Sequence, residues 1–180
     1  MNLLETVNLK KYFGDTHAVD DVSLTIAERE FVSLVGPNGA GKTSLVNVIS
    51  ALLPSDSGKI LFKGEDITHA SVTDRVKAGI ARSFQIVNLF DDLTAFDNVT
   101  LAIFSRQGKT TNLTALAHLD HAVSAEADTI LGQFNLVGKR NERARDLSQG
   151  ERKLLDVALA YALRPKLLFL DEPTSGVSTR

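Results

Sequence analysis

The segment from Gly36 to Thr43 carries the clearest chemical pattern in the sequence. It reads Gly-Pro-Asn-Gly-Ala-Gly-Lys-Thr and fits G-x-x-x-x-G-K-[S/T], the pattern of a loop that cradles phosphates between a strand and a helix. Glycines let backbone N–H groups turn inward around phosphate oxygens, and the helix N-terminus adds positive potential. Lys42 supplies a cation for the outer phosphates, and the Thr43 hydroxyl can ligate Mg²⁺. The expected phosphate-binding residues are Gly36, Pro37, Asn38, Gly39, Ala40, Gly41, Lys42, Thr43 and Ser44.

A second pattern places two carboxylates after an apolar run. Residues 167–170 read Leu-Leu-Phe-Leu and are followed by Asp171 and Glu172. A buried strand that ends in adjacent carboxylates suits a metal and water site, with Asp171 holding Mg²⁺ through water and Glu172 acting as general base. Alone, the pair fits a solvated acidic turn equally well. Beside a phosphate loop, the catalytic interpretation is favoured.

Composition narrows the classes of protein that remain. The chain has 180 residues, 43% of them hydrophobic and 23% charged, which is typical of one soluble globular domain or a domain with a small sub-lobe. The formal net charge of −2 argues against an overall basic surface for nucleic acid. Without cysteine there is neither a disulfide framework nor a thiolate zinc site. We see no bilayer-spanning apolar stretch and no signal peptide, so we expect a cytosolic protein.

Hydrophobic patterns predict the elements that must hold these residues. Strands are expected at 3–9, 22–26, 31–35, 59–62 and 167–170, the third of them buried and leading directly into Gly36. A polar turn is expected around residues 14–17. After Lys42, apolar residues recur on one helix face, at Leu45, Val48, Ile49 and Leu52. Pro54 and the Ser-Asp-Ser-Gly stretch after it are expected to end this helix.

The middle of the chain, about 88–145, is more polar and predicts helices, with residues 105–129 its most loop-rich part. Ser148 is a plausible helix N-cap, and Glu151 three residues later completes a capping box. We expect that helix to continue to about Leu163, because Pro165 marks its end.

The order of these motifs resembles that of ATP-binding cassette (ABC) ATPases. The phosphate loop is followed by Gln85, by Leu-Ser-Gln-Gly-Glu at 147–151 and by Leu-Phe-Leu-Asp-Glu-Pro at 168–173. The resemblance extends from about residue 3 to the end of the chain. It implies an α/β fold: a P-loop NTPase (RecA-like) core with an N-terminal antiparallel β subdomain over 1–84 and 164–180, and an inserted helical subdomain over 85–163 that carries the signature loop.

The segment at 147–151 resembles the family's signature loop, usually Leu-Ser-Gly-Gly-Gln. In the family this loop contacts the γ-phosphate of ATP held by the opposite subunit, which implies that role for Ser148, Gln149, Gly150 and Glu151. Ser148 and Gly150 match the usual pattern, whereas Gln149 and Glu151 depart from it. A carboxylate at 151 is expected to weaken contacts to an anionic nucleotide, an effect that the helix N-terminus partly offsets.

Further site residues follow from the resemblance. Phe13 matches the aromatic residue that stacks on adenine; Tyr12 is the competing candidate, and an aromatic core filler is the structural alternative. Gln85 matches the glutamine that reaches Mg²⁺ and the attacking water. The implied catalytic residues are thus Glu172, Lys42 and Gln85, and the implied Mg²⁺ ligands are Thr43, Gln85 and Asp171.

Two family features are altered or missing after Glu172. The dimer-contact loop usually ends in Asp where this chain has Ser178. The family's switch histidine lies beyond that loop, whereas all four histidines here precede Asp171, at positions 17, 69, 118 and 121. The pattern suggests a C-terminally truncated chain.

Residues 82–99 resemble the ATP-binding subunits of branched-chain amino acid importers. The implied function is to bind and hydrolyse ATP with Mg²⁺ and so power an ABC importer for such amino acids or related small polar solutes. The implied partners are a second ATP-binding subunit, identical or paralogous, and a transmembrane permease. This places the protein on the cytoplasmic face of the membrane, without inserting into it or binding nucleic acid.

Two alternatives remain beside this function. One is a nucleotide-binding module that binds ATP without efficient turnover, which the missing histidine region and the departures at Glu151 and Ser178 motivate. The other is a soluble ABC ATPase that acts on ribosomes or in DNA repair. The short spacer between Gln85 and Ser148 and the near-neutral net charge weigh against it.

Overall fold

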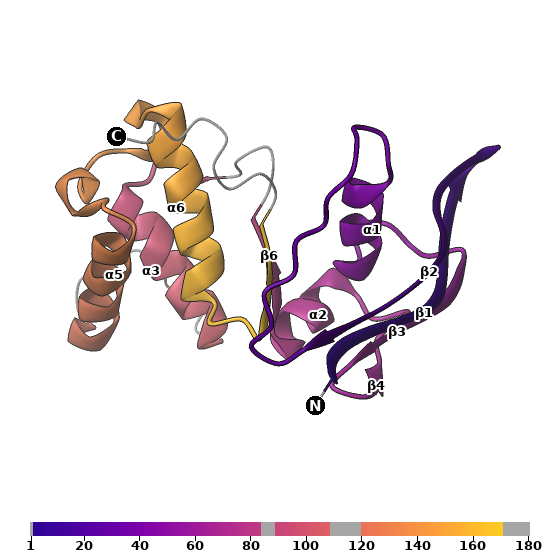
Figure 1. Cartoon of the computed structure of the whole chain (residues 1–180). Helices are drawn as coiled ribbons and strands as arrows, with labels where there is room; N and C mark the ends of the chain where they lie inside the picture. Colours follow the sequence, from indigo (N-terminus) through magenta and orange to yellow (C-terminus); the bar gives the residue numbers. More distant parts are fainter. Residues whose placement is uncertain (1, 84–88, 109–119, 171–180) are drawn as a thin grey trace. The chain divides into compact units, whose positions relative to one another are not determined.

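The computed structural model describes residues 2–83, 89–108 and 120–170 (Figure 1). The chain divides into two compact units, Met1–Ile80 and Ala81–Arg180. The discontinuous core and the inserted helical subdomain expected from the resemblance stay a prediction. None of the helices in the described ranges is long and apolar enough to cross a bilayer.

An antiparallel sheet of strand order β2-β1-β3-β4 forms the frame of the first unit (Figure 1). Its strands are β1 (Asn2–Phe13), β2 (Thr16–Ala27), β3 (Ser57–Phe62) and β4 (Glu65–Asp66). On the central strand β1, Leu4 lies opposite Ile26 of β2 and Phe62 of β3, and all three side chains are buried. Three expected strands and the turn between the first two are thereby confirmed, the strands over longer ranges than the patterns indicated.

Helix α1 (Lys42–Ile49) follows the phosphate-loop sequence and packs against β1 and β2. Leu45, Val48 and Ile49 are buried on one face, as the periodicity predicts. Leu52 is an exception, because the helix ends at Ile49, before Pro54 is reached, and Leu52 is exposed.

The expected buried strand at 31–35 is wrong. This segment has no regular secondary structure; Phe31 is 91% exposed and Val35 is 86% exposed. A short apolar run becomes a buried strand only where neighbouring strands pair with it. Neither sheet of the described chain includes these residues, so their hydrophobicity alone does not create a strand.

Helix α2 (Val72–Ala78) contributes a buried arginine that supports the end of α1. The Arg75 guanidinium donates to the carbonyl oxygens of Val48 (2.8 Å), Ile49 (2.6 Å) and Thr68 (2.8 Å). Burial lowers the pKa of Arg75, which stays protonated because arginine titrates far above neutral pH. The side chain thus supplies charged donors to the carbonyls at the C-terminal end of α1.

The second unit is built on three packed helices (Figure 1). They are α3 (Ala95–Arg106), α5 (His121–Gln133) and α6 (Gln149–Ala162), with 3₁₀ turns η1 (Val137–Lys139) and η2 (Ala144–Asp146) and the paired strands β5 (Ile80–Arg82) and β6 (Leu167–Phe169). Their core includes Phe96, Val99, Ile103, Leu131 and Leu155. The expected helix from Ser148 to about Leu163 is confirmed.

Two other expectations for this unit need correction. Within 105–129, expected to be loop-rich, α3 extends to Arg106 and α5 begins at His121, while 109–119 lie outside the described residues. The strand expected at 167–170 forms as β6, but only Leu167 is buried and Leu170 is exposed. Burial depends on what packs over a strand, which an apolar run does not specify.

The start of α1 depends on Gly41. Its φ of +83° is left-handed, a conformation that favours glycine. A Cβ built on Gly41 would collide with the backbone carbonyl oxygen of Ala18 on β2. Gly39 also has a positive φ, +81°, but a Cβ there meets nothing within 4 Å. Substitution of Gly39 therefore tests the positive φ alone, whereas substitution of Gly41 tests the positive φ together with the close approach to Ala18.

Replacing Arg75 tests the support at the end of α1. We expect Arg75→Met to lower the free energy of unfolding by about 3 kcal/mol or more, because several buried carbonyls lose a charged donor. Urea denaturation measures this, with the exposed α2 substitution Lys77→Met as a control that changes stability by less than about 0.5 kcal/mol. Equal stabilities for the two variants would contradict the role of Arg75.

Replacing each glycine tests the approach of α1 to β2. Gly39→Ala should lower the free energy of unfolding by about 1 kcal/mol, because alanine is strained at a positive φ. Gly41→Ala should lower the free energy of unfolding by at least about 1 kcal/mol more than Gly39→Ala, because α1 must also move away from Ala18. The comparison uses chemical denaturation without nucleotide; a smaller loss for Gly41→Ala than for Gly39→Ala would show that the close approach is unimportant.

Candidate functional site

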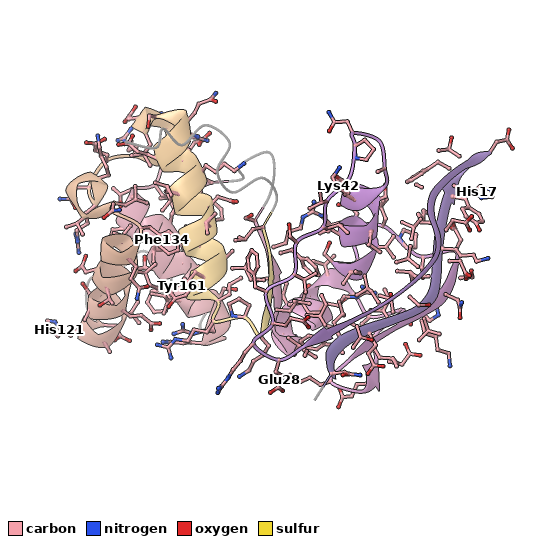
Figure 2. All side chains as sticks on the ribbon, in the orientation of Figure 1. His17, Glu28, Lys42, His121, Phe134 and Tyr161 are labelled. Carbon is pink, nitrogen blue, oxygen red and sulfur yellow. The ribbon has the colours of Figure 1, made fainter. Side chains whose placement is uncertain are left out.

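The phosphate-loop sequence forms a tight turn whose lysine is folded back over it. The Lys42 Nζ donates to the carbonyl oxygens of Gly36 (2.6 Å) and Pro37 (2.7 Å), and the Ala40 N–H donates to the Pro37 carbonyl (3.3 Å). Figure 2 shows Lys42 at the start of α1. An ammonium group has three donors, so the loop leaves at least one for a ligand.

The N-terminus of α1 differs from the other described α-helices in having no side-chain cap. Its N-cap residue is Gly41, and its first turn contains no acidic residue. The remaining helices α2, α3, α5 and α6 are capped by the side chains of Ser71, Thr94, Asp120 and Ser148. First-turn N–H groups have no partner within a helix and attract anions. The exposed Thr43 and partly buried Ser44 stand at this end, so the residues present fit a bound phosphate chain.

Of the two aromatic candidates at the β1–β2 hairpin, Tyr12 is engaged within the protein. Its ring stacks on His17 with centroids 4.1 Å apart, and its hydroxyl donates to Asp20 (2.7 Å). This hydrogen bond, with a small effect of burial and nearby carboxylates, raises the pKa of Tyr12 to about 12. Phe13 is 49% exposed, and the Lys11 ammonium lies over its ring, 5.5 Å from the centroid. Phe13 therefore has the more accessible ring, and the core-filler alternative does not apply to it.

Several expected site residues lie outside the described ranges: Gln85, Asp171, Glu172 and Ser178. Their roles in catalysis, metal binding and dimer contact stay predictions. Of the expected Mg²⁺ ligands, the structure places only Thr43. In the described part of the chain, no group of three or more His, Asp or Glu side chains is arranged to hold a metal ion.

The signature-loop sequence opens α6 with the expected capping box. The Glu151 N–H donates to Ser148 Oγ (3.3 Å), and Glu151 Oε2 accepts from the Ser148 N–H (2.8 Å). These two hydrogen bonds, with help from nearby Lys139, lower the pKa of Glu151. The carboxylate is therefore ionised and turned back onto its own helix. The box does not use the N–H groups of Gln149 and Gly150, which lie in the same first turn.

Ion pairs around the signature helix were not predicted from the sequence. Arg152, one residue after the loop, pairs with Asp91 (2.7 Å), and Arg145 pairs with Asp92 (2.7 Å). The partners are more than fifty positions apart, and no local pattern signals such pairs. The sequence shows only that Asp91 and Asp92 are adjacent, which does not identify their partners. These contacts connect the start of α6 with the segment before α3.

Comparison with known proteins places these features in a family. A family model described as ABC transporter matches residues 19–175. The lipopolysaccharide export ATP-binding protein LptB of Haemophilus influenzae is 36% identical over 98% of this chain and 70% of its own length. The probable branched-chain amino acid transport ATP-binding protein LivG of Methanocaldococcus jannaschii is 30% identical over 99% of this chain and 70% of its own length. The sulfate/thiosulfate import ATP-binding protein CysA of Neisseria meningitidis is 35% identical over 96% of this chain and 46% of its own length.

Solved structures agree with the sequence relatives. MJ1267, an ATP-binding cassette of an ABC transporter, matches with a TM-score of 0.81 and 31% identity, over 99% of this chain and 72% of its own. Its ADP conformation matches with a TM-score of 0.80 and 31% identity, over 99% and 71%. The expected α/β P-loop NTPase fold is thus confirmed. The chain belongs to the ABC transporter family, as one of its nucleotide-binding ATPase subunits.

Proposed function

We propose that the protein binds and hydrolyses ATP to drive an importer for branched-chain amino acids or related small polar solutes. The observation that carries ATP binding is the uncapped N-terminus of α1 with Lys42 folded over the loop before it. The sequence of residues 82–99 and the LivG relative favour an amino acid importer. The LptB and CysA relatives have other cargoes, so the choice of solute rests on this likeness.

ATP binding follows from the chemistry of the loop. On binding, the ammonium of Lys42 exchanges the carbonyls of Gly36 and Pro37 for phosphate oxygens, which are stronger acceptors because they carry charge. Backbone N–H groups from the loop and the first turn of α1 surround the phosphates. The exposed ring of Phe13 stacks on the adenine.

Hydrolysis requires the two carboxylates that follow β6 in the sequence, together with Thr43 and Gln85. Thr43, Gln85 and Asp171 hold Mg²⁺, which neutralises phosphate charge when bound. Glu172 accepts a proton from the attacking water as the water oxygen bonds to the γ-phosphorus and the bond from that phosphorus to the β–γ bridging oxygen breaks, which gives ADP and inorganic phosphate. Gln85 orients that water. Lys42 stabilises the charge that develops on the leaving phosphate oxygens.

The proposed assembly pairs this chain with a second ATP-binding subunit, either a copy or a paralogue. Ser148, Gln149, Gly150 and Glu151 of one subunit face the ATP held by the other. ATP binding closes the pair and hydrolysis reopens it, and this movement drives a transmembrane permease. The pair is located on the cytoplasmic face of the membrane, bound to the permease and not inserted into the bilayer, and has no nucleic acid partner.

Substitutions at Lys42 and Glu172 test binding and hydrolysis separately. Lys42→Ala should weaken ATP binding about tenfold to a hundredfold through loss of a charge-assisted contact. Glu172→Gln should leave ATP binding intact and slow phosphate release by at least about a hundredfold. Fluorescent-nucleotide titration and steady-state phosphate release measure the two effects, with Lys77→Met as the control.

The results also distinguish the alternatives. If Glu172→Gln hydrolyses ATP at the unmodified rate, the assignment of the base is wrong. If the unmodified protein binds ATP but releases no phosphate, it is a nucleotide-binding module without turnover.

The adenine contact has its own test. Phe13→Ala should weaken ATP binding at least about fivefold, since stacking of an aromatic ring on a base contributes about 1–3 kcal/mol. Tyr12→Phe is the matched variant, because it keeps the ring on His17 and removes only the hydroxyl bound to Asp20. It should leave ATP affinity unchanged. If Phe13→Ala also leaves ATP affinity unchanged in a titration, Phe13 does not stack on the adenine.

A further inference from the structure

Lys139, the last residue of η1, lies beside the signature loop. Its Nζ is 3.5 Å from Oε1 of Glu151 and 3.1 Å from Oε2 of Glu142. The hydrogen bond to Glu142 and the charges of both carboxylates raise the pKa of Lys139, so it stays protonated. One ammonium group therefore forms ion pairs with two carboxylates.

The position of Glu151 creates an electrostatic difficulty for this loop. Its carboxylate lies in the first turn of α6, next to the N–H groups of Gln149 and Gly150, which the capping box leaves for a ligand. An anionic side chain at this point opposes the positive potential that makes a helix N-terminus attractive to phosphate. A signature loop with glutamate therefore needs a nearby cation.

We propose that Lys139 is a positioning residue for the signature loop, which acts through Glu151 by offsetting the charge of its carboxylate. The loop then accepts the terminal phosphate of ATP bound by the second subunit. This inference rests on the proposed pairing of two ATP-binding subunits. It assigns a role to a residue outside the loop, which no sequence motif identifies.

The geometry separates this role from a purely structural one. The capping box consists of Ser148 and Glu151 alone, so α6 keeps its N-terminal hydrogen bonds without Lys139. Both Lys139 and Glu151 are partly exposed, and an exposed ion pair contributes little to stability. Glutamine at position 151 also completes a capping box, so Glu151→Gln removes the charge and preserves the helix start.

ATP-driven association of the purified protein tests the proposal. Sedimentation at increasing Mg²⁺–ATP gives the concentration for half-maximal pairing. Lys139→Met should raise this concentration about fivefold at low salt, and the increase should shrink at high salt. In a Glu151→Gln background, Lys139→Met should have almost no effect. Lys139→Arg should behave like the unmodified protein, and Lys77→Met controls for the loss of a distant surface charge.

A further variant should change the ATP concentration for half-maximal pairing in the opposite direction. Glu142→Gln frees the ammonium group for Glu151 and should lower the ATP concentration needed for pairing. If the unmodified protein binds ATP but does not pair, the proposed assembly fails and the inference fails with it. If it pairs and Lys139→Met has no effect, or has the same effect in the Glu151→Gln background, only the role of Lys139 is overturned.

Discussion

The phosphate-binding site depends on the open N-terminus of α1. Backbone N–H groups at a helix start must find partners, and the other described α-helices satisfy them with a serine, threonine or aspartate side chain. At α1 this position is occupied by Gly41, which has no side chain to offer. The donors therefore remain available for a ligand. The same glycine lets the helix start lie against the carbonyl of Ala18, so one residue both opens the site and anchors it to the sheet.

The two ends of α1 differ in whether side chains satisfy their backbone hydrogen-bonding groups. The N-terminus is left without a side-chain partner, whereas the C-terminal carbonyls of Val48 and Ile49 are satisfied by Arg75 from α2. A positive guanidinium also suits the negative end of a helix dipole. The helix is thereby held firmly at the end away from the ligand, and the binding end keeps its unpaired donors. Rigid support behind an unsatisfied site is what pre-organises it for an anion.

Helix α6 shows a different solution at its N-terminus. Ser148 and Glu151 complete a capping box, so part of the first turn is already satisfied by the protein itself. The box confers helix stability and adds a negative charge next to the remaining N–H groups. Lys139 brings a cation to this end from η1, and Arg152 of α6 itself pairs with Asp91 from the segment before α3. The character of this helix start is thus set by residues distant in sequence.

Motifs that depend on near neighbours in the chain could be predicted from the amino-acid sequence. The glycine-lysine-threonine spacing, the capping box and the buried face of α1 all follow from contacts within a few residues, and each appears in the structure. The other features depend on how segments that are distant in the chain pack together. The apolar run at 31–35 lacks a paired neighbour among the described strands and is exposed, and β6 is buried only at Leu167. The partners of Arg75, Lys139 and Arg152 depend on how distant segments pack, because an ion pair or a strand pairing requires a partner that local sequence does not specify.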